Sequence, residues 1–326
     1  MSIEGLPLKR GDQGPAVRDL HQRLLRAGHL CDGDDFGDDT DAAVRAFQQS
    51  RRLEVDGIVG RHTWSALVEA AHRLGDRLLY HKSSPMLRGD DVAELQKRLG
   101  ALGFDAGRVD GIFGPDTAEA LEGFQRNAGL PTDGIFGPDS LAAIERLGGR
   151  ADGANVAEVR EHERLLRTDS ARTCKVMLGE LGGLGALTDT CSRHLVHAGL
   201  SVDSISHPDE SQHARVANAL GVDLYLGLIA ADDPRCSASF FATEGFESTA
   251  GRHLATLLSR HLGTALFETA EPIGQRLPVL RETRMPAVVL RVGPPDTLMA
   301  MTSDFAATIA DCVSRWAAAP ADALVD

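Results

Sequence analysis

The sequence predicts a multidomain protein with two small all-α repeats of three helices each, followed by one three-layer α/β domain with a mostly parallel sheet. Three observations support this fold class. A pattern of about 60 residues occurs twice within residues 1–150. Residues 172–318 alternate short apolar segments with helical ones. A chain of 326 residues is also long enough to form two or three separate cores.

The repeat is defined by two pairs of matching segments. Residues 47–60 (FQQSRRLEVDGIVG) match residues 124–137 (FQRNAGLPTDGIFG), and residues 17–24 (VRDLHQRL) match residues 92–99 (VAELQKRL). The apolar spacing is typical of short amphipathic helices. Asp-Gly pairs favour turns, because glycine tolerates positive φ and aspartate bonds its own following backbone. Each repeat is therefore predicted as helix, Asp-Gly turn, helix, Asp-Gly turn, helix.

A connector separates the repeats from the last domain. Residues 148–155 are small and polar, which is typical of a linker. Residues 156–167 have high helix propensity and many i,i+4 charge pairs but only a weak apolar face. We therefore predict a linker and connecting helix at 149–171, acting as a structural spacer.

The remaining chain alternates between strand and helix patterns, which favours a parallel sheet covered on both faces. Residues 222–229 and 286–292 are the clearest buried strands, since each is an apolar run bounded by Gly, Pro or charge. Further strands are predicted at 174–178, 200–205 and 237–242, and helices at 184–197, 209–220, 246–262 and 304–318.

Composition excludes several classes of partner. The net charge of −13 argues against a nucleic-acid-binding or anionic-membrane-binding surface. No segment is apolar enough to span a membrane, and residues 1–11 lack the apolar core of a signal peptide. The five cysteines lack CxxC spacing, which indicates reduced thiols rather than a disulfide framework. We therefore expect a cytoplasmic protein.

The repeat pattern resembles the peptidoglycan-binding domain found beside many bacterial cell-wall hydrolases. The second repeat matches its signature nearly throughout, whereas in the first repeat His21 replaces the usual Gln and the first turn has one extra residue. We place the two repeats at residues 6–72 and 85–148. The resemblance implies binding near the Asp-Gly turns, and the candidate contact residues are Asp32, Gly33, Phe36, Gly37, Asp56, Gly57, Gly60, Asp110, Gly111, Phe113, Gly114, Gln125, Asp133, Gly134 and Gly137.

Residues 172–320 resemble the zinc-dependent N-acetylmuramoyl-L-alanine amidases. The similarity rests on residues 222–231 (VDLYLGLIAA) and above all on residues 277–293 (LPVLRETRMPAVVLRVG). In that family, two metal histidines align with Leu181 and Ile229, and the glutamate used as general base aligns with Arg291. The remaining ligand has no clear counterpart, with Glu180 or Asp189 as approximate candidates.

These three replacements predict an eroded metal centre and no cofactor. Aliphatic side chains cannot donate to a metal, and a guanidinium stays protonated. A catalytic zinc needs about three protein ligands and one open position. Arg291 either binds an anionic group of a muramyl-peptide precursor or forms a salt bridge with a carboxylate such as Glu180.

Other candidate sites have simpler structural explanations. No carboxylate or cysteine completes a metal site with the histidines, and we expect them to be exposed or capping residues: His194, His197, His207 and His213. Residues 179–185 are glycine-rich but lack the spacing of a phosphate-binding loop. Ser237 and Ser239 have no nucleophile-elbow motif around them, and we interpret them as strand residues.

The whole layout resembles the actinobacterial CwlM family, in which a pseudoenzyme regulates peptidoglycan synthesis. The resemblance implies binding of peptidoglycan fragments or precursors and a cytoplasmic protein partner, such as the UDP-N-acetylglucosamine enolpyruvyl transferase or another precursor-handling protein. The alternative is an active N-acetylmuramoyl-L-alanine amidase that uses zinc through unrecognised ligands. A third option is a scaffold with vestigial binding grooves.

Overall fold

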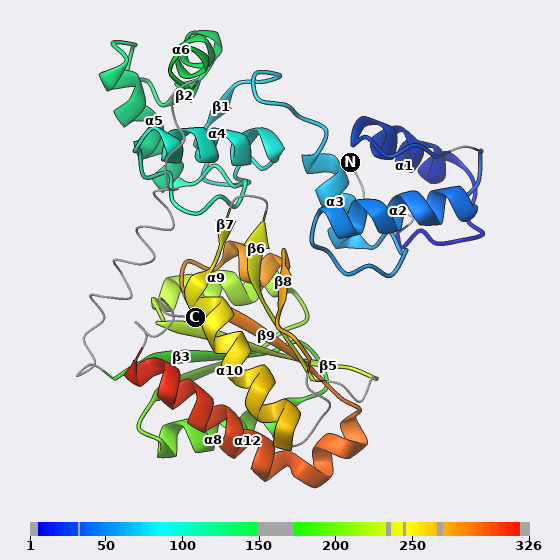
Figure 1. Ribbon diagram of the computed structural model, residues 1–326, viewed down its shortest axis with the longest axis vertical. Coiled ribbons are helices and arrows are strands. Elements are labelled where there is room, and N and C mark those ends of the chain that lie inside the picture. The colour runs from blue at the N-terminus through cyan, green and yellow to red at the C-terminus, as the bar shows by residue number, and fades with distance from the viewer. Residues whose placement is uncertain are drawn as a thin grey trace. The chain divides into compact units, whose positions relative to one another are not determined.

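The structure is a computed structural model that describes residues 6–31, 33–148, 173–232, 236–243, 246–265 and 270–319. The chain divides into two compact units, a helical one that holds both repeats and an α/β one (Figure 1). The linker and connecting helix predicted at 149–171 lie outside the described residues. None of the described helices is long and apolar enough to cross a lipid bilayer.

Both repeats have the predicted order of three helices and two turns. The first repeat contains α1 (Pro15–Arg26), α2 (Asp38–Ser50) and α3 (Arg61–Glu69). The second contains α4 (Asp90–Ala101), α5 (Pro115–Asn127) and α6 (Pro138–Gly148). Prolines occupy the first turn of α1, α5 and α6, where the missing backbone N–H costs no hydrogen bond.

Each repeat has its own apolar core. The largest side chains at its centre have almost no exposed surface: Phe36, Phe47 and Leu67 in the first repeat, and Phe113, Phe124 and Phe136 in the second. The buried residues pair at matching positions of the repeat, with Phe36 and Phe113, Phe47 and Phe124, Val59 and Phe136, and Leu67 and Ile144. The sequence pattern therefore reflects packing as well as turns.

The core of the second repeat begins upstream of residue 85, where the sequence predicted that repeat to start. The short strand β1 (Leu79–Tyr80) pairs antiparallel with β2 (Ile135–Phe136). Leu79 has no exposed surface and packs in the core of the second repeat. In the first repeat a single bridge between Leu8 and Val59 takes the same position.

The α/β unit is built on a mostly parallel sheet, as predicted. Along the sheet the strands follow the order β4 (Ser201–Ser206), β3 (Lys175–Glu180), β5 (Leu224–Ala230), β9 (Ala287–Val292), β6 (Ser237–Thr243) and β7 (Phe246–Glu247), and β8 (Ile273–Gln275) pairs with β6. The first four strands are mutually parallel, whereas β6 runs antiparallel to β9.

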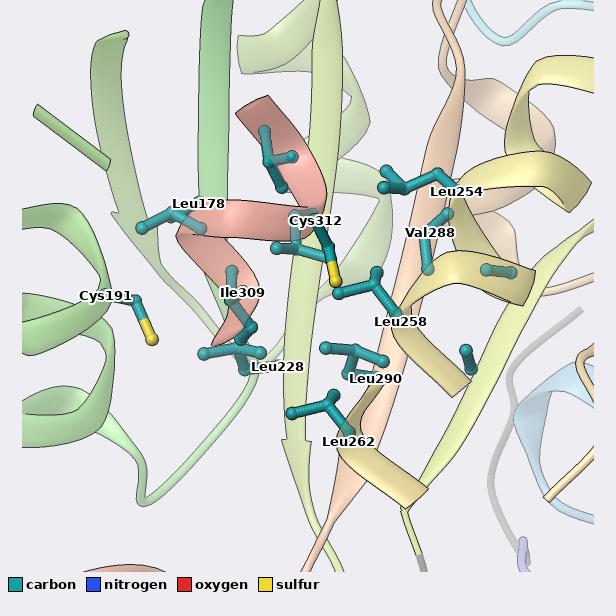
Figure 2. Packing of buried hydrophobic residues seen from close by; sticks show 14 of the residues in the cluster. Leu178, Cys191, Leu228, Leu254, Leu258, Leu262, Val288, Leu290, Ile309 and Cys312 are labelled. Carbon is teal, nitrogen blue, oxygen red and sulfur yellow. The ribbon is translucent and has the colours of Figure 1, made fainter. Parts of the chain in front are cut away.

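Helices cover both faces of this sheet, which confirms the three-layer prediction. On one face lie α8 (Gly185–His197), α10 (Thr249–Ala265) and α12 (Pro295–Ala318), whose apolar residues pack on alternate residues of the central strands (Figure 2). Leu178, Leu228 and Leu290 point into this layer. The other face is covered by α9 (Glu210–Leu220) and α11 (Pro278–Glu282), which contact each other.

Some element boundaries differ from the prediction. The segment predicted as a helix from residue 246 starts with strand β7, and the helix itself begins at Thr249. The closing helix was predicted to start at residue 304 but begins at Pro295, because proline is compatible with the first helical turn. The sequence reading also missed β8 and α11, which are too short to show a periodicity.

Candidate functional site

In each repeat, the second Asp-Gly turn is held by the side-chain amide of a buried glutamine. Nε2 of Gln48 donates to Asp56 Oδ1 (2.7 Å) and to the Ile58 carbonyl (3.0 Å). Oε1 of Gln48 accepts from the Gly57 N–H (2.9 Å). One glutamine therefore satisfies both the side chain and the backbone of the turn, in a position with 1% exposure.

The same arrangement, here called the glutamine clamp, occurs at two turns of the second repeat. Gln96 bonds Asp110 Oδ1 (2.9 Å) and the Gly111 N–H (2.8 Å). Gln125 bonds Asp133 Oδ1 (2.8 Å) and the Gly134 N–H (3.0 Å). The glycines of the three clamped turns have φ between 67° and 73°, the left-handed region that a side chain disfavours.

The first turn of the first repeat lacks the glutamine. His21 takes its place, with Nε2 2.9 Å from Thr40 Oγ1, which in turn donates to the Asp35 carbonyl (3.3 Å). Asp32 lies outside the described residues. The departure that the sequence showed at His21 thus leaves a different hydrogen-bond chain at this turn.

The structure divides the predicted binding residues of the repeats into two groups. The buried group supports the turns from within and comprises Phe36, Gly57, Gly111, Phe113, Gln125 and Gly134. The group with exposed surface comprises Gly33, Gly37, Asp56, Gly60, Asp110, Gly114, Asp133 and Gly137. Direct contact with peptidoglycan stays a prediction. Residues of the second group could contact a ligand without a change in the structure, because their surface is already exposed.

In the α/β unit, three adjacent strands bring residues 181, 229 and 291 to one edge of the sheet. Ile229 on β5 and Arg291 on β9 are register partners. Leu181 directly follows β3, and its N–H donates to the Leu228 carbonyl of β5 (3.2 Å). All three residues are half-buried. The carboxyl ends of parallel strands are where such sheets place their ligands.

The residues at this edge do not fit a zinc ion. Zinc takes nitrogen, thiolate sulfur or carboxylate oxygen ligands, which Leu181 and Ile229 lack, and the guanidinium of Arg291 has no lone pair to donate. Within the described ranges, no group of three or more His, Cys, Asp or Glu side chains could hold a metal ion. This also applies to the four histidines considered above as possible metal ligands, all of which lie in the described ranges.

Glu180 ties the loop after β3 to the sheet. Its Oε1 accepts from the N–H groups of Gly182 (2.7 Å) and Leu184 (2.9 Å), and its Oε2 accepts from Ser206 Oγ (2.5 Å). Burial raises the pKa of Glu180, but these hydrogen bonds, with the nearby His213, outweigh burial and hold the pKa below its usual value. A carboxylate therefore occupies the N–H groups of the glycine-rich loop.

A buried histidine–tyrosine pair explains the glycine at the end of β3. His213 of α9 has no exposed surface, and its Nδ1 lies 2.8 Å from Tyr225 Oη. Its Nε2 lies 2.8 Å from the His207 carbonyl. Burial lowers the pKa of His213 below its ordinary value. A side chain at Gly179 would overlap this pair, which gives that glycine a packing role.

Comparison with known proteins places both halves of the chain. The family model described as "Putative peptidoglycan binding domain" matches residues 13–67 and 88–144. The N-acetylmuramoyl-L-alanine amidase CwlM of Mycobacterium tuberculosis is 33% identical over 335 aligned positions, which cover 89% of this chain and 82% of that protein. The chain belongs to the CwlM family.

Other similarities cover less of this CwlM-family chain. The N-acetylmuramoyl-L-alanine amidase CwlL of Bacillus licheniformis is 34% identical over 150 residues, which are 39% of this chain and 41% of that protein. The crystal structure of an N-acetylmuramoyl-L-alanine amidase from Clostridium difficile 630 covers 44% of this chain and 95% of its own, with 12% identity and a TM-score of 0.34.

The glutamine clamp yields a stability prediction for the CwlM-family repeats. Gln48→Ala leaves the buried Gly57 N–H without its partner, so the free energy of unfolding of the first repeat should fall by about 2–4 kcal/mol. Gln49→Ala is the matched control, because Gln49 is exposed, and should change the free energy of unfolding by less than about 0.5 kcal/mol.

Urea unfolding followed by Trp64 fluorescence measures this effect, because Trp64 packs against the core of the first repeat. Trp316→Phe removes the second tryptophan of the chain and gives a single-probe background. Equal stability of the two glutamine variants would contradict the clamp.

The hydrogen bonds of Glu180 predict a pH dependence of stability. Because the pKa of Glu180 is lowered on folding, its contribution is fully present above the ordinary value of 4.5 and is lost as the pH falls through the folded-state pKa. Glu180→Gln should therefore destabilise the α/β unit at pH 7 by about 1–3 kcal/mol, with a smaller difference from wild type in acid.

Trp316, which is buried in α12, reports this transition in a Trp64→Phe background. Asp189→Asn removes an exposed carboxylate of α8 and serves as the control, with no expected change in slope. A Glu180→Gln variant that parallels wild type at every pH would refute the assigned role of the carboxylate.

Proposed function

We propose that this protein is a catalytically inactive amidase homologue that binds peptidoglycan or its precursors and regulates cell-wall synthesis. The chain is a cell-wall protein of the amidase family, as its similarity to CwlM and its peptidoglycan-binding repeats show. The observation that carries the proposal is the set of Leu181, Ile229 and Arg291 at one edge of the sheet.

Inactivity follows from what those three side chains lack. Hydrolysis by a zinc-dependent amidase needs a metal-bound water and a base that accepts its proton. Two aliphatic residues in place of nitrogen ligands remove most of the metal affinity, and a guanidinium in place of a carboxylate cannot accept a proton at neutral pH. The positive charge of Arg291 also disfavours a cation at the same edge.

Regulation through a partner is the role that suits a binding protein without turnover. The repeats supply binding, and the α/β unit supplies a folded surface that no longer consumes its ligand. We propose that the protein is cytoplasmic. Ligand binding to it changes the activity of an enzyme of precursor synthesis, such as the UDP-N-acetylglucosamine enolpyruvyl transferase. A protein partner agrees with the net charge of −13, because this charge disfavours nucleic acid and anionic lipid as partners.

The test combines binding and turnover on the full chain. Purified protein is mixed with peptidoglycan sacculi and with soluble muropeptides, and an active zinc amidase runs in parallel as a positive control. We expect sedimentation with the sacculi and no release of L-alanine peptides. Release of L-alanine peptides at a rate near that of the control would show an active amidase and overturn the proposal.

The partner has a separate test. The kcat/KM of the enolpyruvyl transferase is measured with and without the full chain, and with muropeptide added. We expect a change of at least about tenfold, equivalent to about 1.4 kcal/mol of transition-state free energy. An unchanged kcat/KM, with no complex in solution, would exclude this enzyme as the partner while leaving peptidoglycan binding intact.

A further inference from the structure

The two-stranded ribbon of the second repeat carries an exposed apolar face. Tyr80 on β1 and Ile135 on β2 are direct cross-strand partners, with 43% and 40% of their surfaces exposed. Their neighbours Leu79 and Phe136 pair on the opposite face and are fully buried in the core. Cross-strand partners stand on the same face of a ribbon, so Tyr80 and Ile135 form one surface.

Leu78 extends this surface. It precedes Tyr80 by two residues and is 53% exposed, and alternate strand residues share a face. Its Cδ2 would lie 3.2 Å from a Cβ built on Gly137, so Leu78 lies across the bare glycine backbone. Leu78, Tyr80 and Ile135, here called the ribbon patch, therefore form a continuous apolar area.

The ribbon patch has only a partial counterpart in the first repeat, where Ile58 matches Ile135 and is 39% exposed. The Leu8–Val59 bridge corresponds to the Leu79–Phe136 pair, which puts Lys9 in the place of Tyr80. Lys9 is exposed and charged, so the first repeat offers no aromatic surface there. Among the described Phe, Trp and Tyr side chains, Tyr80 is the most exposed.

Charged side chains of both signs lie next to the patch in sequence, since exposed Lys82 follows Tyr80 by two residues and carboxylates flank Ile135. Asp133, at the turn before Ile135, is exposed, and the Ile135 N–H and Gln125 hold its pKa below the usual value. Glu122 is also exposed, and its carboxylate lies beside the same turn at Gly134. The carboxylates can accept hydrogen bonds from sugar hydroxyls, and the Lys82 ammonium can donate hydrogen bonds to sugar oxygens.

The first repeat differs in charge at one position beside the matching turn. Arg45 takes the place of Glu122 there, and donates to the Asp56 carbonyl (2.9 Å). Arg45 is also paired with Asp41 (2.8 Å), and Lys9 is an exposed cation where the second repeat has Tyr80. The two repeats therefore share a fold but differ in the surface that they present beside the second turn.

We propose that the ribbon patch is the glycan-binding surface of the second repeat, with the Tyr80 ring packed against the C–H face of a sugar. This inference rests on the proposed binding of peptidoglycan by the repeats. A pyranose has an apolar C–H face and a rim of hydroxyls, which matches an apolar patch with an aromatic ring and with hydrogen-bonding charged side chains on the same ribbon. Tyrosine suits such contacts, because it combines a large apolar area with little conformational entropy.

Glycan strands stripped of their stem peptides provide the test. Their affinity for the full chain is measured for wild type, Tyr80→Ala, Tyr80→Phe and the matched first-repeat variant Lys9→Ala. We expect Tyr80→Ala to weaken binding by at least about tenfold, as removal of an interface aromatic often does. Tyr80→Phe keeps the ring, so it and Lys9→Ala should remain within about threefold of wild type.

The outcomes separate the inference from the proposed function. If wild type binds neither intact sacculi nor soluble muropeptides, the proposed function fails. If wild type binds intact sacculi but not stripped glycan, or if Tyr80→Ala binds stripped glycan as wild type does, the ribbon patch is not the glycan surface and the proposed function stands. Thermal unfolding of each variant checks that exposed Tyr80 can be removed without loss of the fold.

Discussion

The parallel register of β3, β5 and β9 determines which side chains meet at the carboxyl edge of the sheet. Ile229 lies beside Arg291 because β5 and β9 pair at that step, and Leu181 joins them through its bond to Leu228. Backbone hydrogen bonds set this geometry and do not depend on side-chain chemistry. Metal ligands can therefore be replaced at this edge without a change of fold, which is what the amidase resemblance indicates for this chain.

Glu180 holds the loop after β3 through side-chain hydrogen bonds. Its carboxylate bonds two loop N–H groups and Ser206 of the neighbouring strand. Hydrogen bonds to a charged group are stronger than neutral ones, and burial in the protein strengthens them further. Hydrogen bonds within the chain therefore order the loop at this edge of the sheet.

Sequence reasoning predicted the parts of the structure that repeat or show a clear periodicity. The three-helix repeats and the order of the central elements follow from patterns such as the paired Asp-Gly turns and the apolar strand at 222–229. It missed Tyr80, because a two-residue strand outside the repeat pattern has no periodicity to detect. The available signal was the apolar run Leu78-Leu79-Tyr80, in which Leu79 corresponds to Leu8 of the first repeat. The role of Glu180 depends on loop geometry, which spacing alone does not define.

The zinc content of the purified full chain tests the central claim most directly. The protein is loaded with excess zinc, dialysed against metal-free buffer and measured by elemental analysis beside an active zinc amidase. With Leu181, Ile229 and Arg291 at the edge of the sheet, we expect zinc well below one ion per chain, while the control retains about one. A retained ion that is lost on substitution of residues near this edge would contradict the account and reveal ligands that the structure does not assign.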